Sequence, residues 1–522
     1  MSKNNSITIL FIGLSIAFGV LIGSFLNFKG KPTSPFNETT QEAKIKRLIN
    51  YIQYDYVDAV DTDSLLDLTI NQLLKNLDPH SIYIAKNELT RVQETMNGNF
   101  TGIGIQFRII RDTVTVINVI EGGPSFKAKI KAGDRILIAD QDTLFGKNID
   151  NEKVMMKFKS NKPNKIDLVI YRKSENKYLN FSFNRGVVSI KSVPVYYMIN
   201  QTIGFIKIDI FSRYTYHEFR QALLELKKQG MQTLVLDLRN NTGGFLEIAN
   251  QIMDEFLPKG QLMVYTKSKS GKISNSFATN KGEFENGNLY VLINEESASA
   301  SEIVAGAIQD NDRGTIVGRR SFGKGLVQQE MDLGDGSAVR LTTARYYTPT
   351  GRSIQKPYDH KGNENYFDDN EIRAHNGELL YKDSIPVLDS LKFKTPKGKI
   401  VYGGGGIIPD VFVPIDTTFF IHGFQLGAIS DIIFDYTDNN RKKIEKWSFE
   451  EFNKDFDAQI ILDQYYRKKQ EQFHKNNPIF DRMKWYLKAL VAREVFGEVG
   501  YYKIYQEKDD MIQEVLKIEK RN

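Results

Sequence analysis

The sequence predicts a multidomain α/β protein with helical regions on both sides of its α/β part. Its 522 residues are enough for several domains, and 41% of them are hydrophobic, which supplies material for real cores. Short apolar runs alternate with helical stripes across residues 183–417, as in a layer of strands covered by helices. Residues 42–98 and 418–522 instead show helical periodicity.

The predicted α/β core occupies residues 183–417. Its apolar runs have the length and composition of buried strands, and each is followed by an amphipathic or small-residue helical stripe. The runs lie at 203–208, 234–239 and 289–293, and the helical stripes lie at 216–228, from about 246, and at 303–308. Strand and helix therefore alternate along the core, with glycine-rich or small-residue turns between them.

A run of small residues joins the strand at 289–293 to the next helix, and Ser299 lies within it. Lys324 follows between two glycines, and Gln328 lies four residues further on. A serine hydroxyl attacks a carbonyl only if a base removes its proton, and a buried lysine with a lowered pKa can act as that base. The unpaired N–H groups of a first helical turn, Ala300 among them, can donate to an oxyanion.

The same residues allow a purely structural interpretation. Ser299 and Glu302 have the spacing of a capping box, in which a serine and a glutamate satisfy the N-terminus of a helix. The spacing alone therefore leaves a helix cap and a nucleophile both open. Gln328 shares a face with Lys324, and its neutral amide can accept an amine proton without raising the lysine pKa as a carboxylate would.

Three stretches together resemble the signature of the C-terminal processing peptidases, also called tail-specific proteases. They are Ser-Ala-Ser-Ala-Ser-Glu-Ile at 297–303, Ser-Phe-Gly-Lys-Gly at 321–325 and Val-Gln-Gln at 327–329. The resemblance, which covers roughly residues 40–415, implies an α/β serine-peptidase core. It also implies that Ser299 is the nucleophile, Lys324 the general base and Gln328 the residue that orients the lysine.

A Gly-Gly turn follows the strand at 234–239 and leads into a helix. Such a turn can present N–H groups to an anion. A phosphate-binding loop is the functional alternative, although the Walker lysine pattern is missing, and an ordinary structural turn is the simplest one. The resemblance to the family's Asp-Leu-Arg-Asn-x-x-Gly-Gly motif implies one arm of an oxyanion hole here. We expect Gly243, with Gly244 as the next choice, and the N–H of Ala300 as the second arm.

Residues 99–182 form a β-rich stretch that resembles a PDZ domain inserted before the core. The resemblance lies in Gly-Ile-Gly-Ile-Gln-Phe at 102–107, Gly-Gly-Pro-Ser at 122–125 and Ile-Lys-Ala-Gly-Asp-Arg-Ile-Leu at 130–137. It implies that Gly102, Ile103, Gly104 and Ile105 receive a chain-terminal carboxylate and that the next strand edge pairs with a peptide. An ordinary glycine-punctuated β domain is the alternative.

Residues 7–26 carry no charge and are bounded by Lys3 and Lys29. As a helix they would span roughly 30 Å, so we expect a transmembrane anchor between a short segment at 1–6 and a linker at 27–41. A cleaved signal peptide is the alternative, although Ser24-Phe25-Leu26 is a poor cleavage site. Charge does not decide the orientation. The resemblance implies a bacterial inner membrane, with the catalytic part in the periplasm or otherwise outside the cytoplasm.

Two helical stripes lie in residues 42–98, and the second ends at a Leu-Asp-Pro-His-Ser turn whose His80 we expect to be structural. The resemblance implies that this helical region contributes to a homodimer. Residues 357–390 look like a polar, loop-like insertion. Residues 418–522 are expected to be helical and lie beyond the family's motifs, so an assembly surface, a regulatory cap and a contact with an adaptor protein all stay open.

Composition removes several function classes. There is no cysteine, so disulfides and thiolate metal sites are impossible, and the six histidines lack the HExxH spacing of metalloproteases. The net charge of +6 is dispersed rather than gathered in a basic stripe, which argues against a nucleic-acid binder. We expect no metal and no cofactor.

The sequence therefore predicts a membrane-anchored serine endopeptidase that recognises the C-terminal tails of unfolded or precursor envelope proteins. A catalytically degenerate PDZ scaffold or chaperone of the envelope is the alternative from another class, and the intact trio of Ser299, Lys324 and Gln328 speaks against it. A hydrolase for a non-peptide acyl substrate is a third possibility, since fold and nucleophile do not fix the leaving group.

Overall fold

The computed structural model describes residues 40–159, 164–358, 366–417, 426–469 and 479–521. They belong to two compact units, Met1–Leu73 and Leu74–Asn522. The predicted anchor at 7–26, the segment at 1–6 and nearly all of the linker at 27–41 lie outside the described residues. Within the described ranges, no helix combines the length and the apolar character that a bilayer crossing needs.

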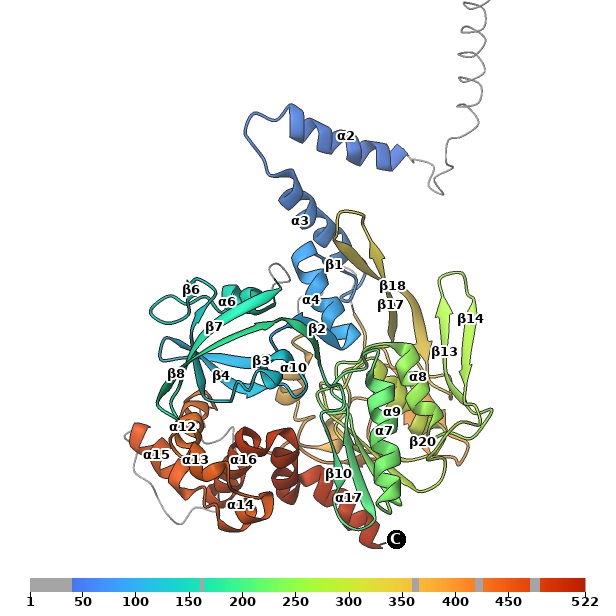
Figure 1. Ribbon diagram of the computed structural model, residues 1–522. Coiled ribbons are helices and arrows are strands. Elements are labelled where there is room, and N and C mark those ends of the chain that lie inside the picture. Colours follow the sequence, from blue (N-terminus) through green and yellow to red (C-terminus); the bar gives the residue numbers. More distant parts are fainter. Residues whose placement is uncertain (1–39, 160–163, 359–365, 418–425, 470–478, 522) are drawn as a thin grey trace, which may run out of the picture. The chain divides into compact units, whose positions relative to one another are not determined.

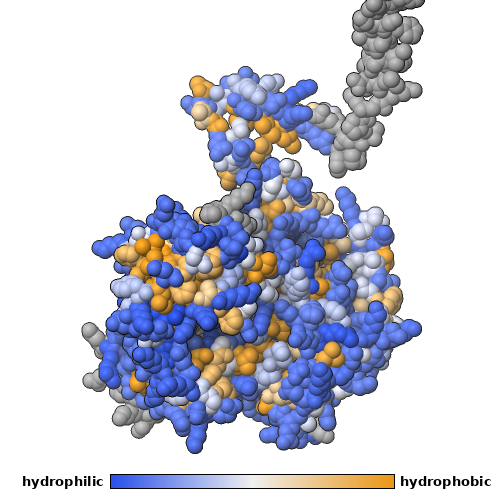
Figure 2. Space-filling view, in the orientation of Figure 1, coloured by the Kyte–Doolittle hydropathy of each residue, from blue (hydrophilic) through white to orange (hydrophobic). Residues whose placement is uncertain are grey.

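The described part of the first unit consists of the two helices that the sequence predicts. They are α2 (Thr40–Tyr54) and α3 (Thr62–Lys75), whose last residues belong to the second unit. Parts of their apolar stripes stay exposed, since Ile45, Leu48 and Leu73 each keep more than half of their surface. Figure 2 shows apolar surface among the polar side chains of these helices. No residue of α2 is buried.

The second unit opens with a turn, a strand and a helix that lead toward the β-rich stretch. These elements are β1 (Ile82–Ile84), α4 (Lys86–Asn97) and β2 (Asn99–Gly102). The strand β2 pairs with β9 (Gly186–Ser189), so the chain enters and leaves residues 103–185 through one two-stranded ribbon. Residues 103–185 are therefore inserted between the paired strands β2 and β9.

The strands between residues 105 and 143 and between 165 and 184 build a sheet in the order β3-β4-β5-β7-β8, with β6 paired to β5. The strands are β3 (Ile105–Ile110), β4 (Thr113–Val119), β5 (Asp134–Ala139), β6 (Asp142–Thr143), β7 (Lys165–Arg172) and β8 (Lys177–Asn184), and the helices are α5 (Pro124–Lys127) and α6 (Asn151–Lys159). Val154 and Phe158 of α6 are buried in the core of this sheet. The strand β3 lies at an edge and pairs, among the described strands, with β4 alone.

A six-stranded sheet lies in the remaining core, in the order β10-β11-β12-β15-β16-β21. Its edge strand β10 is labelled in Figure 1. The strands are β10 (Val195–Met198), β11 (Ile203–Lys207), β12 (Thr233–Asp237), β15 (Asn288–Ile293), β16 (Thr315–Gly318) and β21 (Val411–Phe412). Every neighbouring pair is parallel except β10 and β11. Parallel strands need crossover connections, which the helices between them supply.

Successive residues of β12 point to opposite faces of this sheet and are buried against different helices. Leu234 and Leu236 join a core with residues of α7 (Thr215–Lys228), α8 (Leu246–Asp254) and α9 (Ala300–Asp310). Val235 joins a separate core with residues of α17 (Asp510–Arg521) on the opposite face. The last helix of the chain is thus part of the α/β core rather than of a detached region.

A second sheet in the core carries a long hairpin. Its strands are β13 (Leu262–Ser268), β14 (Ile273–Phe277), β17 (Leu326–Asp332) and β18 (Ala338–Tyr347), with β1 at the other side of β18. A smaller ribbon of β19 (Lys392–Lys394) and β20 (Ile400–Tyr402) follows. The hairpin β17–β18 matters for the site because Gln328 lies in β17 and pairs with Thr342 in β18.

The expectation that residues 357–390 are merely a loop is wrong. The described part of this segment contains the helix α10 (Asp369–His375) and the 3-10 turns η1 (Lys382–Ser384) and η2 (Asp389–Leu391). Arg373 and Glu378 are almost completely buried. The segment carries few apolar residues, so hydrophobic periodicity misses it, whereas its buried charges tie it to the core.

The described residues beyond 425 are mostly helical, as the sequence predicts. The helices are α12 (Leu426–Asn439), α13 (Arg441–Ile444), α14 (Phe449–Asp455), α15 (Gln459–Lys469), α16 (Ile479–Tyr505), η3 (Gln506–Lys508) and α17. The helices α12, α14, α15 and α16 share an aromatic-rich core that includes Phe452, Trp485 and Tyr501, whereas α17 packs on the central sheet. The helix α16 is interrupted at Gly497, whose φ of 69° only glycine adopts easily.

Candidate active site

Ser299 stands between the end of β15 and the first residue of α9. Its φ of 55° and ψ of −113° are unusual for a residue with a side chain, and such strain gathers at functional sites. The preceding turn is tied down by Ser297, whose hydroxyl donates to the carbonyl oxygen of Leu238 at 2.9 Å. The turn thus holds Ser299 in place, half-buried at the helix N-terminus.

Glu302 connects the serine turn to the lysine loop. Its carboxylate accepts the N–H of Ser299 at 2.9 Å and the N–H of Lys324 at 2.8 Å. It also accepts the N–H of Gly323 at 2.7 Å and the hydroxyl of Ser321 at 2.5 Å. Burial raises the pKa of this carboxyl, while the four hydrogen bonds act in the opposite direction. The structural interpretation of Glu302 is therefore right, and its capping bond fixes the backbone of both candidate catalytic residues.

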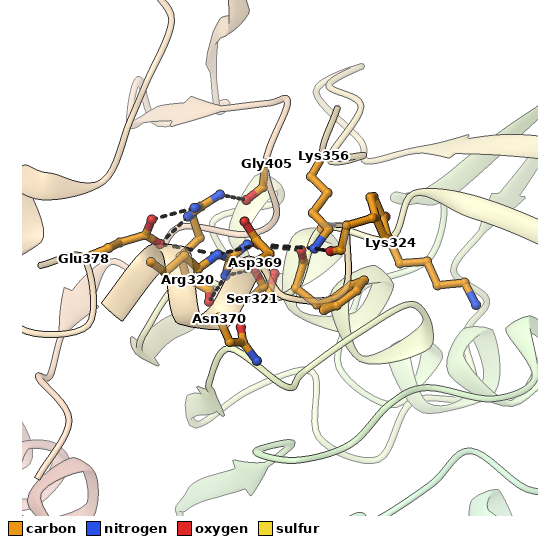
Figure 3. Close-up of polar contacts among 12 residues, drawn as sticks. Arg320, Ser321, Lys324, Lys356, Asp369, Asn370, Glu378 and Gly405 are labelled. Carbon is orange, nitrogen blue, oxygen red and sulfur yellow. Dashed lines mark hydrogen bonds and ion pairs between the residues drawn. The ribbon is translucent and has the colours of Figure 1, made fainter. Parts of the chain in front are cut away.

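The Lys324 side chain points its amine away from the charged side chains of Arg320, Asp369 and Glu378, which lie beside its loop (Figure 3). The amine donates to the Oε1 of Gln328 at 2.8 Å, as the spacing of the two residues predicts. Burial, helped by the positive charge of Arg340, lowers the pKa of Lys324 to about 8. The buried Tyr346 hydroxyl donates to the carbonyl oxygen of Lys324 at 2.7 Å and holds the backbone.

A cavity of about 670 Å³ contains the predicted catalytic residues together. Ser299, Lys324 and Gln328 all line it, with both glycines of the Gly-Gly turn. Within the described residues, Ser299 and Lys324 share this cavity without a direct hydrogen bond between their side chains. Catalytic hydrogen bonds are often long before substrate binds, so the shared cavity is the informative observation.

The Gly-Gly turn lies against Ser299, but its two N–H groups differ. The N–H of Gly243 already donates to the Oδ1 of Asn241 at 2.8 Å, so in this structure it is not available to a substrate. A Cβ on Gly243 would come within 2.7 Å of the Ser299 Cβ, which explains why glycine is needed there. Gly244, the second choice from the sequence, also lines the cavity. Ala300 is fully buried at the first position of α9.

Sequence reasoning missed the residues that hold the lysine loop. Arg320 forms two hydrogen bonds of 2.6 Å with the carboxylate of Glu378 and donates to the carbonyl oxygen of Gly405 (Figure 3). Arg373 donates to the carbonyl oxygens of Ser321 at 2.9 Å and of Phe322 at 3.2 Å. These contacts fix the loop just before Lys324. No local pattern reveals them, because they join segments more than 50 residues apart.

His80 proves structural, as expected, but its surroundings link it to the site. Its Nε2 lies 2.9 Å from the Tyr366 hydroxyl, and burial lowers the pKa of the imidazole to about 3. Its backbone carbonyl oxygen accepts a hydrogen bond from the Nε2 of Gln328. No histidine lines the cavity along the described chain, and no cluster of three or more described His, Asp or Glu side chains is arranged to hold a metal.

The predicted peptide-binding residues lie where β2 gives way to β3. Gly102 ends β2, Ile105 begins β3, and Gly104 between them has a φ of 79°. The carbonyl oxygen of Ile103 accepts the Ser125 N–H at 2.8 Å, which ties the loop to the Gly-Gly-Pro-Ser segment. The loop therefore leads directly into an edge strand, the geometry that adding a peptide strand requires.

Comparisons with known proteins agree with this arrangement. The chain matches peptidase family S41 over residues 202–360, a PDZ domain over 101–182 and a family of unknown function over 421–497. A carboxy-terminal-processing protease of Bartonella bacilliformis is 32% identical over 378 residues, covering 68% of this chain and 86% of the relative. The carboxy-terminal processing protease CtpB of Bacillus subtilis is 31% identical over 318 residues, covering 60% of this chain and 65% of the relative.

A solved photosystem II D1 C-terminal processing protease is 25% identical, with a TM-score of 0.37, and the match covers 72% of this chain and 88% of that one. The sequence relationship to the Bartonella protease, which this chain matches over most of its length, establishes the family. This chain belongs to the carboxy-terminal processing proteases, the serine peptidases of family S41, and carries their PDZ domain.

Proposed function

We propose that this chain is a membrane-anchored endopeptidase that receives C-terminal tails of unfolded or precursor envelope proteins at its PDZ domain and cuts them with a Ser299–Lys324 dyad. The observation that carries the proposal is the shared cavity. It holds a serine at a strained helix N-terminus and a lysine whose pKa burial lowers to about 8. A hydroxyl and an amine of this kind are the two groups that acyl transfer needs.

In the proposed reaction, the neutral Lys324 amine takes the hydroxyl proton of Ser299 as the Ser299 oxygen bonds to the substrate carbonyl carbon. The carbonyl π electrons move to the oxygen, and the N–H groups of Gly244 and Ala300 stabilise the oxyanion. When the carbonyl re-forms, the peptide C–N bond breaks and the leaving amine takes the proton from the Lys324 ammonium. A water molecule, deprotonated by Lys324, then bonds to the acyl carbon; the bond from that carbon to the Ser299 oxygen breaks, and this oxygen takes the proton back from the Lys324 ammonium.

The hydrogen bond to Gln328 is compatible with this role. A neutral amine has two N–H groups and one lone pair, so it can donate to Gln328 while its lone pair faces Ser299. Gln328 would thereby select the amine rotamer that is productive. Gly243, the first choice for the oxyanion hole, contributes instead by packing closely on Ser299 and the Ala300 nitrogen.

Substrate recognition rests on the PDZ domain. The free edge of β3 can accept an extended peptide as a further strand, and the loop formed by Gly102, Ile103, Gly104 and Ile105 can receive the terminal carboxylate. The aromatic contact between Phe107 of β3 and Phe158 of α6, at 5.4 Å between ring centroids, lies beside this edge. Backbone pairing tolerates many sequences, which suits a protease that acts on unfolded tails.

Digestion of an unstructured tail peptide, followed by mass spectrometry, tests the proposal. Ser299→Ala and Lys324→Ala should each lower kcat by at least about a thousandfold, and Gln328→Ala should lower it by about tenfold. Ser270→Ala and Lys281→Ala, which replace a serine and a lysine at exposed positions, serve as controls. A peptide with a C-terminal carboxamide should show a raised KM, because the loop would lose its charged ligand.

Full activity of Lys324→Ala would remove the dyad. A wild-type chain that binds tail peptides without cleaving them would favour the PDZ scaffold or chaperone, and cleavage confined to non-peptide acyl compounds would favour another hydrolase.

The location of the enzyme is part of the proposal. Residues 7–26 would anchor it in the bacterial inner membrane, with the catalytic part outside the cytoplasm. Retention in the membrane pellet after alkaline carbonate extraction is the expected result, and release would contradict it. The exposed apolar stripes of α2 and α3 suit contact with a second copy of this chain or with an adaptor protein.

A further inference from the structure

The amide of Gln328 can face the lysine in only one useful way. Its oxygen must point at Lys324, because the nitrogen end carries only donors and an amine needs an acceptor for its protons. Rotation of the amide by half a turn would replace the oxygen with the NH₂ group. The side chain is unbranched and half-exposed, so something outside it must decide between the two orientations.

The backbone carbonyl oxygen of His80 determines the orientation of the Gln328 amide. It accepts a hydrogen bond from the Nε2 of Gln328, while the Oε1 of Gln328 accepts from Lys324 at 2.8 Å. A carbonyl oxygen can only accept, so the flipped amide would set two oxygens against each other. Lys324, Gln328 and the His80 carbonyl therefore form a chain of hydrogen bonds with one allowed direction.

Asp78 holds the His80 peptide in place. Its Oδ1 accepts the N–H groups of His80 and Ser81, both at 2.9 Å, and its Oδ2 accepts the Ser81 hydroxyl at 2.6 Å. Asp78 is 6% exposed, so water competes little for these bonds. Pro79 adds a fixed φ between the two residues. The carboxylate thus sets the direction of the carbonyl that follows it.

The same aspartate ties this turn to the hairpin that carries Gln328. The Thr342 hydroxyl donates to the Asp78 Oδ1 at 3.1 Å, and the Thr342 N–H donates to the Ser81 hydroxyl at 3.2 Å. Thr342 is the residue of β18 that pairs directly with Gln328 of β17. The turn that contains Asp78 is therefore hydrogen-bonded to the residue that pairs with Gln328 in the hairpin.

We propose that Asp78 is a positioning residue of the protease, which sets the orientation of the Gln328 amide through the His80 carbonyl and thereby aims the Lys324 amine. This inference rests on the proposed role of Lys324. Asp78 does not line the cavity, so its effect on substrate binding should be small. The orienting effect passes through two intervening residues and should change kcat rather than KM. Because the charge of Asp78 also raises the pKa of Lys324, kcat is compared above pH 9, where the amine is nearly all neutral.

The chain contains a matched control for the turn itself. Asp61 accepts the N–H groups of Asp63 and Ser64 at 3.1 and 3.3 Å and the Ser64 hydroxyl at 2.7 Å, the same three-bond pattern as Asp78. It lies in the first unit, at the start of α3. Asp61→Ala therefore removes an equivalent turn without touching Gln328.

The test is a double-mutant cycle on tail-peptide cleavage. Asp78→Ala should lower kcat by about tenfold with KM unchanged, the value of roughly one buried hydrogen bond. In the Gln328→Ala background the same substitution should change kcat by less than about twofold, because the residue it orients is gone. Asp78→Asn keeps an Oδ1 acceptor for His80 and should restore most of kcat, and Asp61→Ala should match the wild type.

Two results would overturn this inference and leave the proposed function intact, provided that Ser299→Ala is inactive. The first is a wild-type kcat in Asp78→Ala. The second is a loss of kcat on adding Asp78→Ala to Gln328→Ala that equals the loss in the wild-type background. If Ser299→Ala stays active, the proposed function itself fails and this inference with it. Should Asp78→Ala not fold, Thr342→Val replaces it, with a smaller loss of kcat and the same dependence on Gln328.

Discussion

At Lys324, burial and neighbouring charges compete for control of one amine. Burial is the largest influence and lowers its pKa to about 8, and Arg340 acts in the same direction, whereas Glu302 and Asp78 act against them. Only the neutral amine can take a proton from Ser299. At pH 7 about a tenth of the amine would be neutral, and above pH 9 nearly all of it. Activity should therefore rise with pH between these values.

Arg340 offers a way to move this transition. Removing its positive charge in Arg340→Gln should raise the pKa of Lys324, so the acidic limb of the kcat/KM profile should shift to higher pH. Arg345 lies on the same strand, is exposed and does not line the cavity. Arg345→Gln is thus the matched control and should leave the limb in place. A shift to lower pH in Arg340→Gln, or equal shifts in both variants, would contradict this account of the lysine.

At the scale of elements, the C-terminal helices join the PDZ domain through charge. The helix α12 carries acidic residues at positions 431, 435 and 438, which lie on one face of a helix. Each contacts a cation of the PDZ domain. The pairs are Arg108–Asp431 at 3.2 Å, Arg111–Asp435 at 2.5 Å, Arg135–Asp438 at 2.7 Å and Lys173–Asp438 at 3.0 Å. A region of unknown function thereby contacts the peptide-binding module directly.

These ion pairs differ in solvent exposure, so they should contribute differently to the free energy of unfolding. The Asp438 side chain is 4% exposed, whereas that of Asp431 is 55% exposed. Asp438→Ala should leave Arg135 without its partner and lower the free energy of unfolding by roughly 2 kcal/mol or more, while Asp431→Ala should change it little. Hydrogen exchange in α12 and β5 should accelerate for Asp438→Ala. Equal exchange in the two variants would show that this contact does not hold the helix.

The element that sequence reasoning misread most is α10. It is short and has no apolar stripe, so it gives no periodic signal. Its contribution is Arg373, which is buried and donates to carbonyl groups of the lysine loop. Its partner Asp369 lies 2.7 Å away on the same helix. Buried polar contacts of this kind depend on the full fold, so a pattern search along the chain does not find them.

For the whole molecule, the alternation of strands and helices was readable because each strand is a short apolar run. The order of the central sheet was not, because β21 joins β16 from nearly 100 residues away and α17 covers a face of the sheet from the end of the chain. The proposed catalytic trio was readable because its residues lie in local motifs that resemble those of the family, which their spacing alone would not have decided. The Asp78 turn was not linked to it, since that link crosses 248 residues between His80 and Gln328.

Gly243 illustrates the same limit of local reading at the oxyanion hole. The sequence predicts the Gly-Gly turn, and both glycines line the same cavity as Ser299. Which N–H stays available depends on the side chain of Asn241, whose Oδ1 is taken up by Gly243. That hydrogen bond forms only in the folded turn, so no local sequence pattern predicts which N–H it occupies.

The proposed activity depends on a serine that reacts because a neighbouring amine is neutral. The most direct measurement is the rate at which a fluorophosphonate labels Ser299, located by mass spectrometry, as a function of pH. In the wild type this rate should rise through a midpoint near pH 8, following the pKa of about 8 for Lys324. In Lys324→Ala it should fall by at least about a hundredfold and lose that midpoint. Equal labelling of the two proteins across this range, or a label on another residue, would contradict the account.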